Sequence, residues 1–182
     1  MVGSSKKIMI DETAFDFPQI DSQPTPCLDC TNDKGEDSQF LQNFIDKRAL
    51  KNQKAHLGTT YCINYKNKTI GYVTLASANI HKDEIISKKR AATRDGPLFP
   101  SMIILDFCID KKLRGKGFGK YVLMWCNGLA RIVSEKIGCR YIVLFTKDAI
   151  NFYKKYNYRV AETPKKGDFT LMYVDVFPEL RK

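Results

Sequence analysis

The stretch that most constrains the fold is a basic, glycine-rich turn between an apolar strand and a long helix. Ser101–Ile109 (SMIILDFCI) has no Gly or Pro and is rich in Ile and Leu, which predicts a central, largely buried strand. From Gly117 to about Ile137 apolar residues recur at intervals of three and four, which predicts a helix with one packed face. These residues are Phe118, Val122, Trp125, Leu129, Ile132 and Val133.

The turn has the chemistry of a phosphate-binding site. Glycines at positions 115, 117 and 119 allow a sharp turn and a close approach of the backbone to a ligand. The N–H groups at the start of the following helix, together with the positive end of its dipole, suit a phosphate or pyrophosphate. Four lysines add positive charge around it: Lys111, Lys112, Lys116 and Lys120. The alternative interpretation is a surface turn that is simply rich in Lys and Gly.

Two common nucleotide motifs do not fit this turn. The dinucleotide fingerprint GxGxxG requires a different glycine spacing. In the phosphate-loop motif GxxxxGK[ST] the Lys precedes Ser or Thr, whereas Tyr121 follows Lys120 here and the first spacing is short.

The pattern instead resembles the acetyl-CoA signature R/Q-x-x-G-x-G/A of the GNAT N-acetyltransferase superfamily, which also follows a buried strand. In this chain the signature is formed by Arg114, Gly115, Lys116, Gly117, Phe118 and Gly119. A second motif of that family, F-Y-x-x-x-G-F, is similar to Phe152–Tyr158 (FYKKYNY). Two motifs in this order are much more specific than either motif alone.

The expected element order is also that of the GNAT fold. We expect a helix at Ser38–Asn52 with Ser38 as N-cap, strands at Thr59–Tyr65 and Thr69–Ala78 around a tight turn at Lys66–Lys68, an irregular segment at Ile80–Pro97, a strand at Cys139–Thr146, a short helix at Asp148–Tyr156, and strands at Tyr158–Ala161 and Phe169–Val176. Gly138 ends the long helix. The resemblance covers about residues 37–177 and implies a mixed α/β fold, with a mostly antiparallel central sheet flanked by helices.

Charge divides the chain into two parts. Residues 1–40 carry 3 Lys/Arg and 8 Asp/Glu, whereas residues 41–182 carry 27 and 12. We expect residues 1–36 to form an acidic N-terminal arm, with Ile8–Phe17 able to pair with a sheet edge, and residues 37–182 to form the acetyltransferase domain. The basic body favours a polyanionic partner such as RNA, but a solvated lysine-rich surface explains the charge equally well.

The cysteines and the absence of long apolar runs predict a cytoplasmic protein with free thiols. No apolar run approaches 18 residues and no secretory signal is evident, so we expect no membrane partner. Core thiols are expected at Cys62, Cys108, Cys126 and Cys139. Cys27 and Cys30 form a polar CxxC pair, but neither His56 nor His81 stands at a zinc-site spacing, so no metal is expected and the role of the pair stays open.

The GNAT resemblance implies direct acetyl transfer, in which a neutral amine attacks the acetyl-CoA thioester and the thiolate leaves. It implies that Phe107, Cys108 and Ile109 pair with the pantetheine arm and that the segment Arg114–Lys120 holds the pyrophosphate. Tyr153 matches the family tyrosine that protonates the leaving sulfur. The alternative for Tyr153 is a purely structural role, packing its helix on the sheet.

The general base is less evident from the sequence. Many family members use a Glu on the signature strand, and Ile103 occupies that position here. Asp106 is the only carboxylate on the strand, on the opposite face by alternation, and is our candidate base, with a buried paired acid or a water relay as alternatives. The missing Glu suits an amine that arrives neutral, such as an α-amino group with a pKa of about 7.7–8.

The chain departs from the family pattern at two further points. Asn157 replaces the glycine of the second motif, and Asn tolerates the left-handed conformation that this glycine is expected to adopt. The Asn that many members place ahead of the tyrosine helix is missing, and Thr146 or Asn151 is expected to substitute for it.

A looser similarity to toxin-like GNATs that acetylate charged tRNA comes from the Ser38–Asn52 helix and the stretches GYVTLAS and GCRYIVLFTKD. The acceptor stays open among protein or peptide amines, aminoacyl-tRNA, and small polyamine or antibiotic amines. The protein is expected to be a monomer or homodimer, and an antitoxin partner cannot be inferred from the chain. A different class of function is a catalytically idle GNAT-like module that binds acyl-CoA or nucleic acid, which the presence of Tyr153 and an intact turn disfavours.

Overall fold

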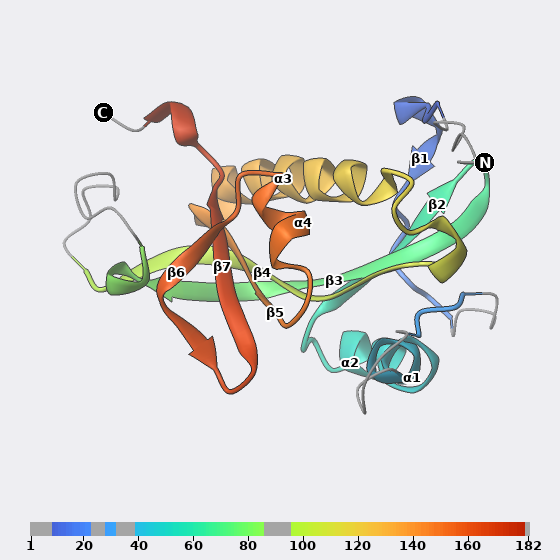
Figure 1. Cartoon of the computed structure of the whole chain (residues 1–182), viewed down its shortest axis with the longest axis horizontal. Helices are drawn as coiled ribbons and strands as arrows, with labels where there is room; N and C mark the ends of the chain where they lie inside the picture. Colours follow the sequence, from blue (N-terminus) through green and yellow to red (C-terminus); the bar gives the residue numbers. More distant parts are fainter. Residues whose placement is uncertain (1–8, 23–27, 32–38, 86–95, 181–182) are drawn as a thin grey trace, which may run out of the picture. The chain divides into compact units, whose positions relative to one another are not determined.

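The computed structural model describes residues 9–22, 28–31, 39–85 and 96–180 (Figure 1). Its strands are β1 (Phe15–Asp16), β2 (Thr59–Tyr65), β3 (Lys68–His81), β4 (Leu98–Ile109), β5 (Tyr141–Thr146), β6 (Arg159–Lys166) and β7 (Phe169–Asp175). Its α-helices are α1 (Phe40–Lys47), α2 (Ala49–Lys54), α3 (Phe118–Ile137) and α4 (Ile150–Lys154). Short 3₁₀ turns lie at Glu12–Ala14, Lys82–Glu84, Lys111–Leu113 and Pro178–Leu180.

The strands form one mixed sheet in the order β1-β2-β3-β4-β5-β7-β6. β4 and β5 pair in parallel, with Ser101 opposite Tyr141. The pairs β1–β2, β5–β7 and β6–β7 are antiparallel. The predicted fold class, a mostly antiparallel sheet with helices, is therefore confirmed.

The chain folds as two compact units, which we describe separately. The first unit comprises Met1–Thr74 and Asp106–Val122. Its core contains Phe44 and Ile45 of α1 and Tyr72 of β3, with the Phe44 and Tyr72 rings stacked at 6.0 Å. Ile20 and Leu28, from the segment predicted to be an arm, are buried in the same cluster.

The second unit comprises Leu75–Leu105 and Leu123–Lys182. Its core is aromatic, because Tyr141 packs edge-on against Phe99 and Tyr173 at 5.6 and 5.9 Å. Arg140 donates to buried Asp175 at 2.9 Å, so the end of β7 carries a paired charge. Figure 1 shows β6 and β7 as the hairpin that precedes the C-terminus.

The N-terminal helix departs from prediction. The expected helix at Ser38–Asn52 is two helices, α1 and α2, that break at Arg48, where φ is −120°. The Arg48 guanidinium lies over the rings of Phe40 and Phe44 at 5.0 and 5.7 Å. Ser38, the expected N-cap, lies outside the described residues.

The strands flanking the segment expected to be irregular are longer than predicted. β3 runs on to His81 and β4 begins at Leu98. Of the basic residues predicted in that segment, Lys88, Lys89, Arg90 and Arg94 lie outside the described residues.

The bounds of the long helix are confirmed, but its predicted packed face is only partly right. α3 ends at Ile137 and Gly138 follows with φ +75°. Ile132 is 60 % exposed, whereas Cys126 and Ala130 are fully buried. Apolar residues cover more than one side of this helix, so periodicity alone fitted two candidate faces.

Two turns and the edge pairing agree with the predictions. Lys66 and Asn67 have φ values of 50° and 60°, the conformation of a tight two-residue hairpin between β2 and β3. Phe15 and Asp16 pair with Tyr65 and Asn64 at the sheet edge, as predicted for the N-terminal stretch. Within the described residues, no helix has the length and apolar character needed to cross a membrane.

Candidate functional site

The predicted phosphate turn leaves the end of β4 through a capped 3₁₀ turn. Asp110 N–H donates to the Ile70 carbonyl at 2.8 Å, which holds the chain beside β3. The Asp110 carboxylate accepts from Lys112 N–H at 2.9 Å and so caps the 3₁₀ turn. This local hydrogen bonding ends the strand and directs the chain toward the glycines.

The two central glycines of the turn are required by their backbone conformation. Gly115 has φ +73° and Gly117 has φ +97°, values at which a side chain is strained. A Cβ at Gly115 would meet nothing within 4 Å among the described residues, and at Gly117 only Ile10 Cδ1 at 3.5 Å. The turn is thus open on its surface, and α3 begins directly after it at Phe118.

Exposed positive charge surrounds the start of α3. Lys112, Lys116 and Lys120 are all exposed, as are Gly115 and Gly117. An α-helix presents N–H groups without intrahelical partners at its first turn. Backbone donors and ammonium groups therefore face the same exposed turn, which suits a polyphosphate.

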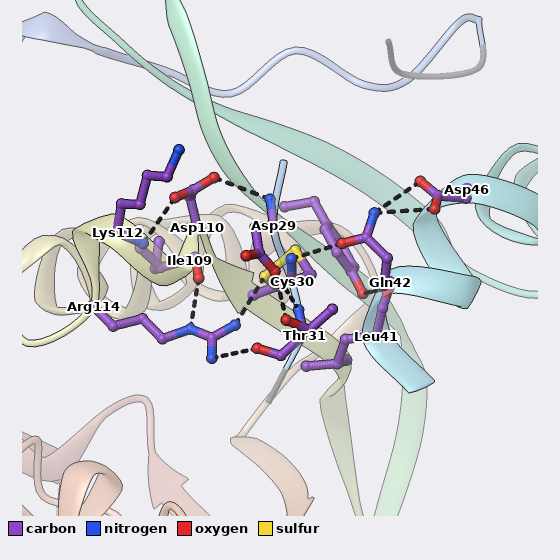
Figure 2. Close-up of a disulfide and its surroundings, with 12 residues drawn as sticks. Asp29, Cys30, Thr31, Leu41, Gln42, Asp46, Ile109, Asp110, Lys112 and Arg114 are labelled. Atoms are coloured by element: carbon purple, nitrogen blue, oxygen red, sulfur yellow. Dashed lines mark hydrogen bonds between the residues drawn. A yellow bond between two sulfur atoms is a disulfide. The ribbon is translucent and has the colours of Figure 1, made fainter. Parts of the chain in front are cut away.

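Arg114 differs from these lysines, because its guanidinium points into the protein (Figure 2). Its Nε donates to the Ile109 carbonyl at 2.9 Å and its Nη1 donates to the Thr31 carbonyl at 2.8 Å. Its Nη2 lies 3.9 Å from Cys108 Sγ. The side chain thus fastens the turn to the end of β4 and to residues 28–31, a role that the sequence did not predict.

The prediction of free thiols is wrong for two cysteines. Cys30 and Cys108, 78 residues apart, form a disulfide. The sequence associated Cys30 with Cys27, its neighbour in the CxxC pattern, which lies outside the described residues. Only the fold brings Cys30 beside β4, so residue spacing could not reveal the pair.

The other cysteines of the described segments match the prediction. Cys62, Cys126 and Cys139 are free thiols, with Cys62 half-buried and the other two buried. No group of three or more His, Cys, Asp or Glu side chains in the described part of the chain is arranged to hold a metal ion.

Aromatic side chains from the N-terminal segment anchor the helix that follows the turn. Phe118 packs edge-on against Phe15 and Tyr65, with ring centroids at 6.2 and 5.1 Å. Phe15 also lies 5.2 Å from the ring of Tyr121. The N-terminal segment therefore positions the turn as well as extending the sheet.

Asp106, the candidate base, is a buried carboxyl of the first unit. It is 7 % exposed, and this burial raises its pKa to about 6, with Arg48 acting in the opposite direction. Burial, and then the Asp106 charge, raise the pKa of Tyr72 in turn. A carboxyl with this pKa is mostly ionised at neutral pH and can accept a proton.

Tyr153, the candidate acid, belongs to the second unit and is described within it. Its side chain is 7 % exposed and its ring contacts those of Phe152 and Tyr158 at 5.0 and 5.4 Å. Burial, followed by the nearby Cys126 thiol, raises the pKa of Tyr153 above its usual range. The phenol therefore holds its proton at neutral pH, as a general acid must.

The ends of the tyrosine helix agree with the predicted substitutions. Thr146 Oγ1 accepts from Ala149 N–H at 3.1 Å and so caps the helix start. Asn157 has φ +66°, and the following Tyr158 N–H donates back to the Tyr153 carbonyl at 3.3 Å. The predicted left-handed Asn157 is confirmed, and it closes the helix as the missing glycine would.

Two contributors to the site were missed from the sequence. A Cβ at Gly71 would lie 2.2 Å from the Cys108 carbonyl oxygen, so β3 and β4 approach closely beside the expected pantetheine strand. A glycine inside an apolar strand pattern was the available signal. The second contributor is the segment of residues 28–31, where Asp29 N–H donates to the Asp110 carboxylate at 3.0 Å. No pattern in the sequence marks this contact.

The structure therefore groups most of the predicted residues in the first unit. Phe107, Cys108 and Ile109 end β4, Asp106 precedes them, and the segment from Arg114 to Lys120 follows. Tyr153 is grouped with Cys126 and Tyr158 in the second unit.

Comparison with known proteins gives consistent relatives. A family model described as an acetyltransferase (GNAT) domain matches residues 56–160. A tRNA-acetylating toxin of Mycobacterium tuberculosis (strain ATCC 25618 / H37Rv) is 24 % identical over 125 residues, which is 68 % of this chain and 74 % of the toxin.

Solved structures show the same fold at low sequence identity. AtaT complexed with acetyl-methionyl-tRNAfMet superposes with a TM-score of 0.75 at 15 % identity, covering 88 % of this chain and 94 % of AtaT. The Y145F mutant of KacT also has a TM-score of 0.75 at 15 % identity, with coverages of 90 % and 95 %. AtaTR bound with acetyl-CoA has a TM-score of 0.69 at 17 % identity, with coverages of 92 % and 98 %.

Proposed function

Because the chain belongs to the GNAT acetyltransferase family, we propose that it transfers the acetyl group of acetyl-CoA to the α-amino group of an aminoacyl-tRNA. The observation that carries the cofactor assignment is the exposed turn with positive φ at Gly115 and Gly117 that opens α3 directly after β4. The similarity to a tRNA-acetylating toxin and to AtaT supports the acceptor.

The first unit supplies the acetyl-CoA site in this proposal. The backbone of Phe107–Ile109 pairs with the pantetheine arm. Backbone N–H groups of the turn and the first residues of α3 bind the pyrophosphate, and Lys116 and Lys120 neutralise its charge. Arg114 contributes by holding the turn in shape, since its guanidinium donates to two backbone carbonyls.

Tyr153 and Asp106 divide the proton transfers. The amine attacks the thioester carbonyl, the C–S bond breaks, and the Tyr153 phenol passes its proton to the leaving thiolate. The nitrogen loses a proton to Asp106, directly or through water, because the Asp106 pKa of about 6 leaves it ionised at neutral pH. Tyr153 regains its proton when the thiol product leaves.

The charge of the chain and the pKa of the acceptor favour charged tRNA. Residues 41–182 carry 27 Lys/Arg against 12 Asp/Glu, a balance that attracts a polyanion. An α-amino group titrates at about 7.7–8, so a useful fraction is neutral without a strong base, whereas a lysine at about 10.4 is almost fully protonated.

The decisive experiment compares acceptors under identical conditions. The protein is incubated with radiolabelled acetyl-CoA and, in separate reactions, aminoacyl-tRNA, the same tRNA uncharged, and a peptide with a free N-terminus. We expect label only on the aminoacyl group and stoichiometric thiol release. Label on the peptide alone would overturn the acceptor assignment. Acetyl-CoA binding without thiol release for any amine would favour the idle binding module.

Three further predictions remain proposals. We propose a functional boundary near residue 36, a monomer or homodimer, and a cytoplasmic location. An antitoxin-type partner is also proposed, because AtaT has been crystallised with the antitoxin AtaR. Light scattering after size-exclusion chromatography measures the oligomeric state, and deletion of residues 1–36 tests whether the arm is separable.

A further inference from the structure

The disulfide covalently connects two parts of the predicted acetyl-CoA site (Figure 2). Cys108 lies in the last residues of β4, the expected pantetheine strand, and Cys30 lies in the segment 28–31. Both residues are buried, at 3 % and 0 % exposure. The bridge therefore lies beneath the surface that leads into the glycine turn.

The segment 28–31 is fastened to the turn at every residue next to Cys30. Asp29 N–H donates to the Asp110 carboxylate at 3.0 Å, and the Asp29 carbonyl accepts from Lys111 N–H at 2.8 Å. The Thr31 carbonyl accepts from Arg114 Nη1 at 2.8 Å. Residues 110, 111 and 114 begin the turn, so the position of this segment affects the geometry of the turn.

We propose that the Cys30–Cys108 disulfide is a redox switch for acetyl-CoA binding. In the bridged form residues 28–31 are held against the turn and Arg114 braces it for the pyrophosphate. In the reduced form the segment and its Thr31 carbonyl are released, the Arg114 brace is lost, and acetyl-CoA binds more weakly. The proposal rests on the acetyl-CoA role assigned above to the same turn.

Hydrogen bonds alone are too weak to replace the bridge. Each contributes only about 1 kcal/mol net, and the segment 28–31 contributes few buried side chains besides Leu28 and Cys30. A short segment held by such contacts opens locally at modest cost. The covalent link to β4 prevents this opening from displacing the segment.

The redox chemistry is that of thiol–disulfide exchange. A dithiol reductant attacks one sulfur as its thiolate and forms a mixed disulfide. Its second thiol then closes a disulfide within the reductant. Two electrons and two protons pass to Cys30 and Cys108, and the reductant is oxidised. Because both sulfurs are buried, we expect the exchange to be slow and to require excess reductant.

Cys62 supplies the matched control for this switch. It is a free thiol packed against the same core cluster as Cys30 and Cys108. Replacing it tests whether thiol exchange with a neighbour, and not the bridge itself, explains any response to reductant.

The experiment measures the acetyl-CoA dissociation constant calorimetrically in bridged and reduced protein. Alkylation and mass spectrometry establish the state of the cysteines, and circular dichroism verifies that the reduced form is folded at the assay temperature. We expect reduction by excess dithiothreitol to weaken binding about tenfold. Cys30→Ser should be equally weak with and without reductant, and Cys62→Ser should behave as the wild type does.

A double-mutant cycle tests the route through Arg114. If the bridge acts by positioning Arg114, Cys30→Ser combined with Arg114→Lys should lose no more affinity than the more severe single variant. Multiplying losses would overturn the route through Arg114.

Equal affinity of the folded bridged and reduced proteins would overturn the switch while leaving the acetyl-CoA assignment intact. Failure of the bridged protein to bind acetyl-CoA would instead overturn the proposed function of the turn.

Discussion

The two units hold their functional residues by different physical means. In the first unit the glycine turn is exposed, and polar contacts shape it: the Asp110 cap, the Arg114 brace and the disulfide behind them. In the second unit Tyr153 is buried among aromatic rings and beside the Cys126 thiol. The binding surface is thus open and cross-linked, whereas the candidate acid is enclosed and packed.

This difference follows from what each part must do. A turn that binds a polyphosphate must present N–H groups and positive charge to water, so it cannot be stabilised by burial and needs polar and covalent braces. A tyrosine that must keep its proton until a thiolate forms gains from burial, because desolvation disfavours the phenolate. The binding site should therefore be sensitive to backbone and charge changes, and the acid to loss of one hydroxyl.

The largest effect is expected at the turn. Gly117→Asp forces a side chain into φ +97° and adds negative charge where the pyrophosphate would bind. We expect a loss of acetyl-CoA affinity of roughly a thousandfold, or about 4 kcal/mol, by calorimetric titration. Gly128→Asp, on an exposed part of α3 with open space around it, is the matched control and should bind normally. Normal binding by Gly117→Asp would remove the turn from the cofactor site.

The next effect separates chemistry from binding. Tyr153→Phe removes the proton donor but keeps the ring packing, so we expect kcat to fall about a hundredfold with little change in acetyl-CoA affinity. Tyr158→Phe is the control, because its buried hydroxyl has no hydrogen-bond partner among the described residues. Equal losses of kcat and affinity in Tyr153→Phe would mean that Tyr153 is structural.

A third prediction concerns pH. Burial raises the pKa of Asp106 from 3.8 to about 6 in the folded protein, so the folded state binds this proton more tightly than the unfolded state. Its contribution to stability is complete below pH 4 and is lost as the pH rises through 6.

Asp106→Asn should remove that pH dependence. We expect the variant to be more stable than the wild type by about 2 kcal/mol at pH 7.5, with a smaller difference at pH 4.5, measured by denaturant unfolding. If Asp106 is the base, the same variant loses activity while binding acetyl-CoA normally. A stability gain without loss of activity would reduce Asp106 to a buried structural acid.

The smallest effect is expected away from both sites. Gly128 lies on the exposed side of α3, and a Cβ there would meet nothing within 4 Å among the described residues. Gly128→Ala should raise the free energy of unfolding by about 1 kcal/mol through helix propensity alone. Unchanged kcat and acetyl-CoA affinity would show that the long helix can be stabilised independently of either site.

Much of the fold was predictable because the relevant signals are local. The strand leading to Ile109, the turn, and a helix ending before Gly138 follow from apolar periodicity and glycine placement. The left-handed Asn157 was predictable because few residues tolerate that backbone. The helix break at Arg48 was not, since it depends on how α1 and α2 pack against Tyr72.

The sequence by itself determined the family, the phosphate-type turn and the candidate acid, because each is encoded by residues that are neighbours in the chain. Only the tertiary structure decided that Cys30 pairs with Cys108, that Arg114 points inward, and that Asp106 is buried enough to raise its pKa. These properties arise from contacts between residues far apart in the sequence, and no local pattern records them. The turn that first defined the chain is thus a local motif whose shape depends on a distant segment.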